Sequence, residues 1–219
     1  MILFRAGQQL ALTALSIGAS SPRMSTALMR VLPIDFTEPT VALEWMAVDD
    51  RIMGGASQSR VVFADGATSF EGNLIVEGGG FASVRFGPAL ELGARDEVLV
   101  LEASSDGRLG YKVTLTSAVA SPGVSYQFTL PQLLEDEREK ISLPLEQFKP
   151  SFRGQAAPDA PPLRATDVRG LGLMLSRYEG GGGEGKQSIE PGAFRLRLHR
   201  LEAEESALAR NSRRWAQKK

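Results

Sequence analysis

Residues 45–57 read Trp-Met-Ala-Val-Asp-Asp-Arg-Ile-Met-Gly-Gly-Ala-Ser, and residues 77–85 have a similar pattern as Glu-Gly-Gly-Gly-Phe-Ala-Ser-Val-Arg. In each stretch a run of glycines precedes a small residue or a serine, with large apolar side chains and a charge on either side. Glycine clusters in such surroundings indicate backbone in unusual φ/ψ regions beside a packed surface. These two stretches carry most of the information about the fold.

The composition excludes several classes of protein. The chain has 219 residues, enough for one large β domain or two smaller ones, and its 42% hydrophobic content is ordinary for a globular protein. Lys and Arg number 25 against 26 Asp and Glu, so no overall field attracts nucleic acid or a membrane surface. The absence of cysteine excludes a disulfide framework, a cysteine nucleophile and a thiolate metal site, and a reducing compartment fits it.

The N-terminal segment, residues 1–30, differs in composition from the rest of the chain. It contains Arg5, Arg23 and Arg30 among Ser, Thr, Ala and Leu, and no acidic residue. This composition is typical of an organelle transit peptide, so we interpret the segment as a cleavable or disordered leader, addressed to the mitochondrial matrix or alternatively to a plastid. The apolar stretch at residues 10–19 is shorter than the ~20 residues that a membrane-spanning helix needs. We therefore expect no direct membrane span.

From Leu32 onward the dominant pattern is short runs with a period of two, separated by turn residues. The predicted strands are residues 59–63, 69–76, 82–86, 98–103, 111–116, 125–130, 140–143, 172–176 and 193–201. The last is the clearest, because Phe194, Leu196, Leu198 and then Leu201 predict a buried face, while Arg195, Arg197 and His199 are expected to face water. Strands without intervening amphipathic helices predict an all-β sandwich or jelly roll of two antiparallel sheets over residues 31–202.

Three other segments are predicted not to be strands. Residues 148–167 contain four prolines, including Pro150, which resist a hydrogen-bonded ladder. Residues 178–191 contain a run of glycines, and both segments are expected to be loops at the rim of the sandwich. Residues 203–219 are predicted to form a basic C-terminal helix or tail, whose cations would complement the negative end of a helix dipole. This segment is expected either to be solvated or to be a docking element for a partner.

The motifs for enzyme chemistry are weak. Gly180 begins a near match to the phosphate-binding loop G-x-x-x-x-G-K-[ST], but Gln187 replaces the hydroxyl that must reach magnesium. No G-x-G-x-x-G opens a strand–helix unit, which leaves a dinucleotide fold unsupported. The single histidine, His199, has no cysteine or second histidine to complete a zinc site. We predict no catalytic residues, no metal and no cofactor.

Two acidic motifs favour turns over catalysis. Asp49 and Asp50 are adjacent, so on an extended chain their side chains point to opposite faces and cannot easily share a proton. One of them is expected to order the following turn by bonding backbone amides, or to pair with Arg51. Residues 106–108, Asp-Gly-Arg, precede Tyr111 and predict a hairpin turn.

The order and spacing of several landmarks resemble one family. These landmarks are Asp35-Phe36, Trp45, Val48-Asp49-Asp50-Arg51, Met53-Gly54-Gly55 with Ser57, Phe70-Glu71-Gly72, Gly79-Gly80-Phe81-Ala82-Ser83-Val84-Arg85, Asp106-Gly107-Arg108 with Tyr111, Phe148, Phe152-Arg153-Gly154 and Gly170-Leu171-Gly172. Over residues 34–201 the chain is similar to the complex I intermediate-associated protein 30 family. The resemblance implies a galactose-binding-like β-sandwich and a role as an assembly factor for mitochondrial complex I, with relatives in photosynthetic lineages acting in plastids.

The sequence departs from the family pattern at two places. Glu77 or Gly78 stands where an asparagine is common, and a tryptophan usual before the Leu-Pro-x-x-x-Phe segment is missing, with residues 137–139 reading Glu-Arg-Glu in that region. These departures affect an inherited ligand surface more than the fold. The resemblance implies no catalytic constellation.

The resulting hypothesis is a non-enzymatic binding protein that contacts protein subunits or intermediates of a membrane complex, and not nucleic acid. The predicted partner-binding patch comprises Trp45, Asp50, Arg51, Met53, Gly54, Gly55, Phe81, Ser83 and Arg85. The competing hypothesis is a purely structural role. In that role Trp45, Met53 and Phe81 are core residues and the glycines only allow tight turns. Three further hypotheses are a plastid complex as the partner, a carbohydrate-binding module, which needs exposed aromatic platforms, and an enzyme relying on Asp50.

Overall fold

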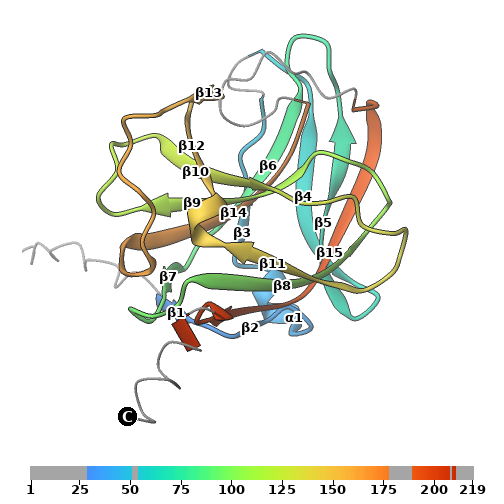
Figure 1. Cartoon of the computed structure of the whole chain (residues 1–219). Helices are drawn as coiled ribbons and strands as arrows, with labels where there is room; N and C mark the ends of the chain where they lie inside the picture. The colour runs from blue at the N-terminus through green and yellow to red at the C-terminus, as the bar shows by residue number, and fades with distance from the viewer. Residues whose placement is uncertain (1–28, 51–53, 178–188, 208, 211–219) are drawn as a thin grey trace, which may run out of the picture.

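The computed structural model describes residues 29–50, 54–177, 189–207 and 209–210, and these residues form a β-sandwich of two antiparallel sheets (Figure 1). The seven-stranded sheet has the order β13-β12-β10-β9-β14-β6-β3. Its strands are β3 (Trp45–Ala47), β6 (Phe81–Phe86), β9 (Tyr111–Ser117), β10 (Val124–Thr129), β12 (Lys149–Phe152), β13 (Gln155–Ala156) and β14 (Val168–Ser176). The predicted fold class, a galactose-binding-like sandwich, is confirmed.

The six-stranded sheet has the order β11-β8-β15-β5-β4, with β2 paired to β15 beside this path. Its strands are β2 (Ile34–Asp35), β4 (Gln58–Ala64), β5 (Ala67–Leu74), β8 (Val98–Ser105), β11 (Glu139–Pro144) and β15 (Gly192–Glu204). Figure 1 shows β4, β5 and β15 side by side. β1 (Met29–Val31) pairs in parallel with β7 (Ala89–Glu91), and α1 (Pro39–Ala42) is a single short helix. Short 3-10 turns occur at Leu145–Gln147 and Ala165–Asp167.

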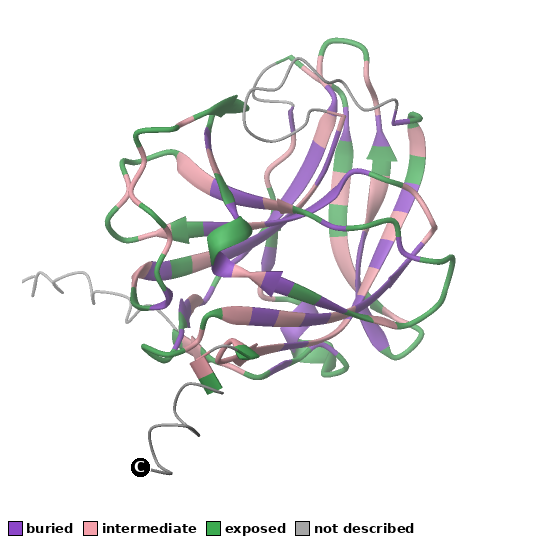
Figure 2. Ribbon diagram, viewed as in Figure 1, coloured by how far each residue is buried: buried purple, intermediate pink, exposed green. Residues whose placement is uncertain are grey.

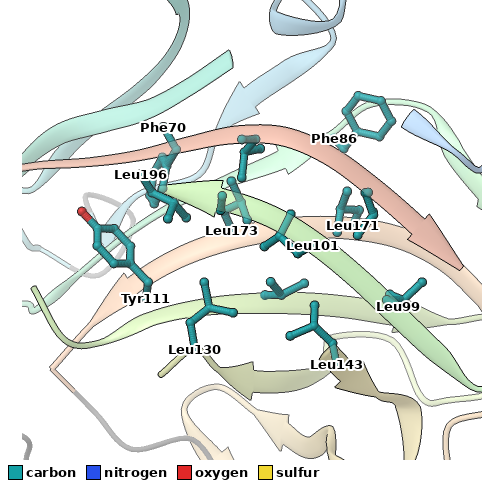
Figure 3. Close-up of a cluster of buried hydrophobic side chains, with 14 of the residues drawn as sticks. Phe70, Phe86, Leu99, Leu101, Tyr111, Leu130, Leu143, Leu171, Leu173 and Leu196 are labelled. Carbon is teal, nitrogen blue, oxygen red and sulfur yellow. The ribbon is translucent and has the colours of Figure 1, made fainter. Parts of the chain in front are cut away.

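The core lies between the sheets and is built from the alternating inward positions of both (Figure 2). Figure 3 shows part of it, with Leu99, Leu101 and Leu196 of the six-stranded sheet close to Leu171 and Leu173 of the seven-stranded sheet. Each is at most 5% exposed, so these side chains lose nearly all contact with water. Burial of this apolar surface is the main favourable term in the folding of such a sandwich.

All nine predicted strands overlap observed strands, and β15 explains a break in the predicted alternation. Phe194, Leu196 and Leu198 are buried at a period of two, but the next buried residue is Leu201, three positions on. A β-bulge between Leu198 and Arg200 shifts the pairing with β8 and restores the inward direction of Leu201. The bulge also leaves His199 half-buried, with its Nε2 atom 3.4 Å from Ser104 Oγ, rather than fully solvated as predicted.

The prediction that residues 148–167 form only a loop is wrong. They contain the β12–β13 hairpin, in which Phe152 pairs with Gln155. Pro150 lies where the ladder with the edge strand β13 ends, since β13 pairs only with Ser151 and Phe152, and its carbonyl oxygen still accepts the backbone N–H of Ala157 at 3.1 Å. The other predicted loop, residues 178–191, lies largely outside the described residues.

The C-terminal segment is only partly as predicted. Ala203 and Glu204 belong to β15 and not to a helix. A helical turn begins after Ser206, whose Oγ atom accepts a hydrogen bond from the backbone N–H of Ala209 at 3.2 Å, as an N-cap does. Residues 211–219, like residues 1–28 of the predicted leader, lie outside the described residues. Within the part of the chain that is described, no helix has the length and apolar character needed to cross a membrane.

Candidate functional site

Asp50 connects the two sheets at one end of the sandwich. Its side chain is fully buried and accepts hydrogen bonds from Ser57 N (3.1 Å to Oδ1), Ser57 Oγ (2.9 Å to Oδ2) and the backbone nitrogens of Gly80 and Phe81 (2.9 and 3.3 Å to Oδ2). Ser57 lies just before β4 of the six-stranded sheet, whereas Gly80 lies just before β6 of the seven-stranded sheet and Phe81 is its first residue. The carboxylate therefore replaces water for four donors and ties two segments together.

Asp49 makes a second connection of the same kind. Its carboxylate accepts the backbone N–H groups of Ser59 at 2.9 Å and Ser83 at 3.1 Å, and the Ser59 hydroxyl at 2.5 Å. Ser59 belongs to β4 and Ser83 to β6. The Ser83 hydroxyl donates in turn to the backbone oxygen of Val48. The two adjacent aspartates thus point to different partners, as predicted for an extended chain, and both order backbone amides.

The glycine clusters are required by the Asp50 carboxylate. A Cβ atom at Gly55 would lie 2.2 Å from Asp50 Cγ, and one at Gly79 would lie 2.1 Å from Asp50 Oδ2. Both distances are far below van der Waals contact, so neither position has room for a side chain. The glycine-rich stretches at residues 45–57 and 77–85 therefore face each other across one buried carboxylate.

Asp106, directly after β8, organises a turn in a similar way. Its Oδ1 atom accepts the hydroxyl of Tyr111 at 2.9 Å, and its Oδ2 atom accepts Arg108 Nε and the backbone N–H of Arg195, both at 3.1 Å. The Arg108 guanidinium also donates to the backbone oxygen of Ala193 at 2.7 Å. Burial, with the neighbouring Asp106 charge, raises the pKa of Tyr111 far above its ordinary value, so the hydroxyl remains a donor.

A cleft of about 460 Å³ lies against the outer face of the seven-stranded sheet, and we call it the sheet cleft. Its lining comes from the second glycine cluster, from β6, β9, β10 and β14, and from the turn between β12 and β13. The lining residues that matter for recognition are Phe81, Ser83, Arg85, Lys112, Gln127, Arg153, Gln155 and Met174. Its volume is in the range of ordinary small-ligand sites.

Strand register brings the cleft residues together. Ser83, Met174 and Lys112 are successive partners across β6, β14 and β9, so their side chains form one row on the outer face. Arg85 of β6 follows Ser83 by two positions and therefore points to the same face. Lys112 is buried, at 2% exposure, whereas Arg85 is exposed.

The predicted partner-binding residues separate into three groups in the structure. Phe81, Ser83 and Arg85 line the sheet cleft. Asp50 also reaches the cleft but is buried, and Gly55, which follows Gly54, lies against its carboxylate. Trp45 is a core residue, 9% exposed, with its ring centroid 5.0 Å from that of Phe86 and 6.2 Å from that of Phe36. Arg51 and Met53 lie outside the described residues.

Sequence reasoning missed Lys112, Gln127, Arg153, Gln155 and Met174 as cleft residues. A lysine between the apolar residues Tyr111 and Val113 of a predicted strand was one available indication, because burial of a charge requires a reason. The remaining residues could be grouped only with the strand register and the β12–β13 hairpin in hand.

The described residues contain no group of His, Asp or Glu side chains placed to hold a metal ion. His199 lies on the outer face of the six-stranded sheet, away from the sheet cleft. Burial is the main cause that lowers its pKa from the ordinary value, with Arg138 and Arg197 adding to the effect and Glu102 opposing it. Both aspartates of the Asp49–Asp50 pair are occupied by structural hydrogen bonds.

The two antiparallel sheets place the molecule in the class of β-sandwich domains, with a ligand-sized cleft against one sheet. The family model of complex I intermediate-associated protein 30 matches residues 34–198, and the chain belongs to this family.

Two further comparisons give one protein that is similar to this chain in sequence and one that is similar in fold. An uncharacterized protein of Schizosaccharomyces pombe is 24% identical over 152 residues, which cover 62% of this chain and 69% of that protein. A family 11 carbohydrate-binding module of a cellulosomal cellulase from Clostridium thermocellum superposes with a TM-score of 0.51 at 12% identity, covering 81% of this chain and 98% of the module. The second similarity establishes the fold alone.

Proposed function

We propose that the protein is a non-enzymatic assembly factor that binds a subunit or intermediate of an organellar membrane complex, foremost respiratory complex I in the mitochondrial matrix. Membership of the complex I intermediate-associated protein 30 family is the observation that carries this proposal. The binding surface is the sheet cleft with Phe81, Ser83 and Arg85. Trp45, Asp50 and Gly55 act through the fold, because their buried contacts hold the cleft wall in place.

The structural support for binding rather than catalysis is that the carboxylate in the cleft, Asp50, is already hydrogen-bonded within the protein. General acid–base work needs a carboxyl group that can exchange a proton with a substrate. Asp50 is the acidic residue among the described residues of the cleft lining, and its oxygens already accept four hydrogen bonds. The cleft is equipped to hold a ligand by charge and shape.

A carbohydrate ligand has less support. Sugar-binding faces rely on exposed aromatic platforms on which the ring stacks. Phe81 is the aromatic residue among the described cleft-lining residues, and it is half-buried. Retardation of the protein in polysaccharide-containing gels tests this alternative directly, and the proposal expects none.

The proposal is tested by identifying the proteins that associate with this protein in its native cell. We expect a C-terminally tagged protein to co-migrate with partial complex I on native gels of isolated mitochondria, with subunits identified by mass spectrometry. Co-migration with a photosynthetic complex in plastids supports the binding role and replaces the mitochondrial location by a plastid one. A free monomer in every fraction contradicts the proposal.

A further inference from the structure

We infer that the sheet cleft binds an acidic, extended segment of the partner protein, with Arg85 and Arg153 as the charged contacts. This inference rests on the proposed function, because it specifies the chemistry of the partner that the cleft holds. It depends on three features of the described residues, which are the charge of the cleft, the geometry of the β12–β13 turn and the composition of the cleft floor.

The cleft is cationic on a protein that has almost no net charge. The formal net charge of the whole chain is −1. Among the described lining residues, Arg85, Lys112 and Arg153 are cations and Asp50 is the acidic residue, enclosed by its four hydrogen bonds. A local excess of one sign in a concave site raises the concentration of ligands of opposite sign and selects against others.

Arg85 and Arg153 are the two cations that a ligand can reach. Both are exposed, and none of the ion pairs found between described residues involves either of them. In contrast, Arg60, Arg195 and Arg197 on the other sheet pair with Glu or Asp. A guanidinium without an internal carboxylate keeps its planar donors for an external one.

Arg153 lies in a turn whose backbone conformation is unfavourable for an arginine. The two-residue loop between Phe152 and Gln155 has φ of +50° at Arg153 and +81° at Gly154, as a type I′ hairpin requires. Asn or Gly is the usual residue at the first of these positions, and a bulky residue with positive φ costs on the order of 1 kcal/mol. Strained positions of this kind concentrate at functional sites.

The Arg153 guanidinium is also held in place. It lies 5.2 Å from the ring centroid of Phe152, a cation–π distance, and that ring in turn packs so closely on Gly123 that a Cβ there would lie 2.9 Å from it. Gly123 lies in the cleft lining as well. An arginine positioned before the ligand arrives loses less side-chain entropy on binding.

The floor of the cleft fits a polypeptide better than a lone anion. Met174 and Phe81 provide apolar surface, and the amides of Gln127 and Gln155 can each donate and accept hydrogen bonds. Methionine adapts to irregular apolar partners. An extended chain alternates its side chains, so carboxylates can reach Arg85 and Arg153 while apolar residues contact Met174.

The test is a binding titration with the purified full chain. The probe is a short fluorescein-labelled peptide in which Glu alternates with Leu, compared with the same peptide carrying Gln for Glu. We expect the Glu peptide to bind, with affinity that falls as salt is added, and the Gln peptide to bind at least about tenfold more weakly. Equal affinity for both peptides overturns the inference.

The decisive variant is the double substitution Arg85→Glu/Arg153→Glu. Each reversal should weaken the Glu peptide on the order of tenfold, which corresponds to about 1.4 kcal/mol. The matched control is Arg95→Glu/Arg164→Glu, which changes the net charge equally at exposed positions away from the cleft and should change the affinity less than about twofold. Equal weakening by the control overturns the inference, since total charge then explains binding.

Arg153→Asn separates recognition from folding. Asn suits the positive φ at this position, so the variant should unfold no more easily than the parent while it loses the Arg153 share of the affinity. Unchanged affinity in this folded variant removes Arg153 from the site. Vesicles containing phosphatidylserine are the competing ligand, and binding to them without binding to the Glu peptide rejects a polypeptide occupant.

The same variants on native gels distinguish failure of the inference from failure of the proposed function. If the parent co-migrates with partial complex I and the Arg85→Glu/Arg153→Glu protein does so equally, the assembly role stands and the acidic-segment inference is wrong. If the parent itself migrates alone, the proposed function is wrong whatever the peptide titration gives. We expect the parent and the control variant to co-migrate and the reversed variant to be released.

Discussion

The Oδ2 atom of Asp50 lies 2.9 Å from the backbone nitrogen of Gly80, a residue 30 positions later in the chain. The same carboxylate accepts hydrogen bonds from Ser57, just before β4, so one side chain connects the two sheets. Buried carboxylates that accept several amide donors are strong local constraints, because loss of the acceptor leaves each donor without a partner. Substitutions at Asp50 and at the glycines around it should therefore act on stability.

Asp50→Asn should lower the free energy of unfolding by about 3 kcal/mol, because an amide directs an NH₂ group at some of the four donors. The measurement is urea unfolding followed by circular dichroism. Asp159→Asn, at an exposed position, is the control and should change stability by less than about 0.5 kcal/mol. A stable Asp50→Asn protein contradicts the structural role of this carboxylate.

Gly55→Ala should destabilise the fold more than Gly54→Ala, although the two residues are adjacent. The added methyl at Gly55 meets Asp50 at 2.2 Å, whereas the space around Gly54 is open and only its φ of +88° opposes a side chain. We expect a loss of about 3 kcal/mol or more at Gly55 and on the order of 1 kcal/mol at Gly54. The reverse order in thermal or urea unfolding is the contradicting result.

Trp45→Ala should cost about 3–5 kcal/mol, as removal of a buried aromatic side chain does. The milder Trp45→Phe keeps the contacts with Phe36 and Phe86 in part and should remain folded. Partner co-migration on native gels should be unchanged for this folded variant, because the indole lies in the core. If Trp45→Phe lost the partner without losing stability, Trp45 would have to be part of the binding surface.

Tyr111→Phe removes the hydrogen bond to Asp106 and should lower stability by about 1 kcal/mol. The pKa of Tyr111 is raised in the folded state, so its contribution is present below the ordinary tyrosine pKa of about 10 and is lost as the pH rises above it. The parent protein should therefore lose stability between about pH 10 and 11 more steeply than Tyr111→Phe. Identical alkaline slopes are inconsistent with this assignment.

His199 should make the fold less stable in mild acid. Burial lowers its pKa in the folded state, so the unfolded chain binds the proton more tightly and stability falls as the pH drops below about 6.5. Since the chain has one histidine, His199→Gln should flatten the stability profile between about pH 7 and 5.5. Urea midpoints at several pH values give the measurement, and an unchanged slope in the variant excludes His199 as the cause.

The fold was predictable because β15 and its neighbours obey simple alternation. Phe194, Leu196 and Leu198 face the core as their period of two required, and the Asp49–Asp50 pair orders backbone as an adjacent pair on an extended chain should. The bulge before Leu201 and the β12–β13 hairpin were missed. The bulge appears in the sequence only as the three-residue step from Leu198 to Leu201, and the pairing of β12 with β13 is decided by the partner strand and not by local residues.

The candidate site was predictable only in part. Phe81, Ser83 and Arg85 were chosen because they come directly after a glycine cluster, and the structure places them in the lining of the sheet cleft, while their role in binding stays a prediction. Lys112 and Met174 come from other strands and join the cleft through register, which no single stretch of sequence contains. Trp45 and Gly55 belong to the same motif but serve packing, and a motif alone does not show which of its side chains point inward.

The central position of β15 has a consequence for how the protein reaches its folded state. β15 lies between β8 and β5, so a nascent chain that has not yet reached Gly192 holds β11–β8 and β4–β5 as two separate pairs with an unfilled gap. The six-stranded sheet cannot close during synthesis of the preceding residues, and its apolar inner face stays open until then. Such non-local closure is slow, and it leaves the apolar surface of the unfinished sheet exposed to aggregation until β15 is in place.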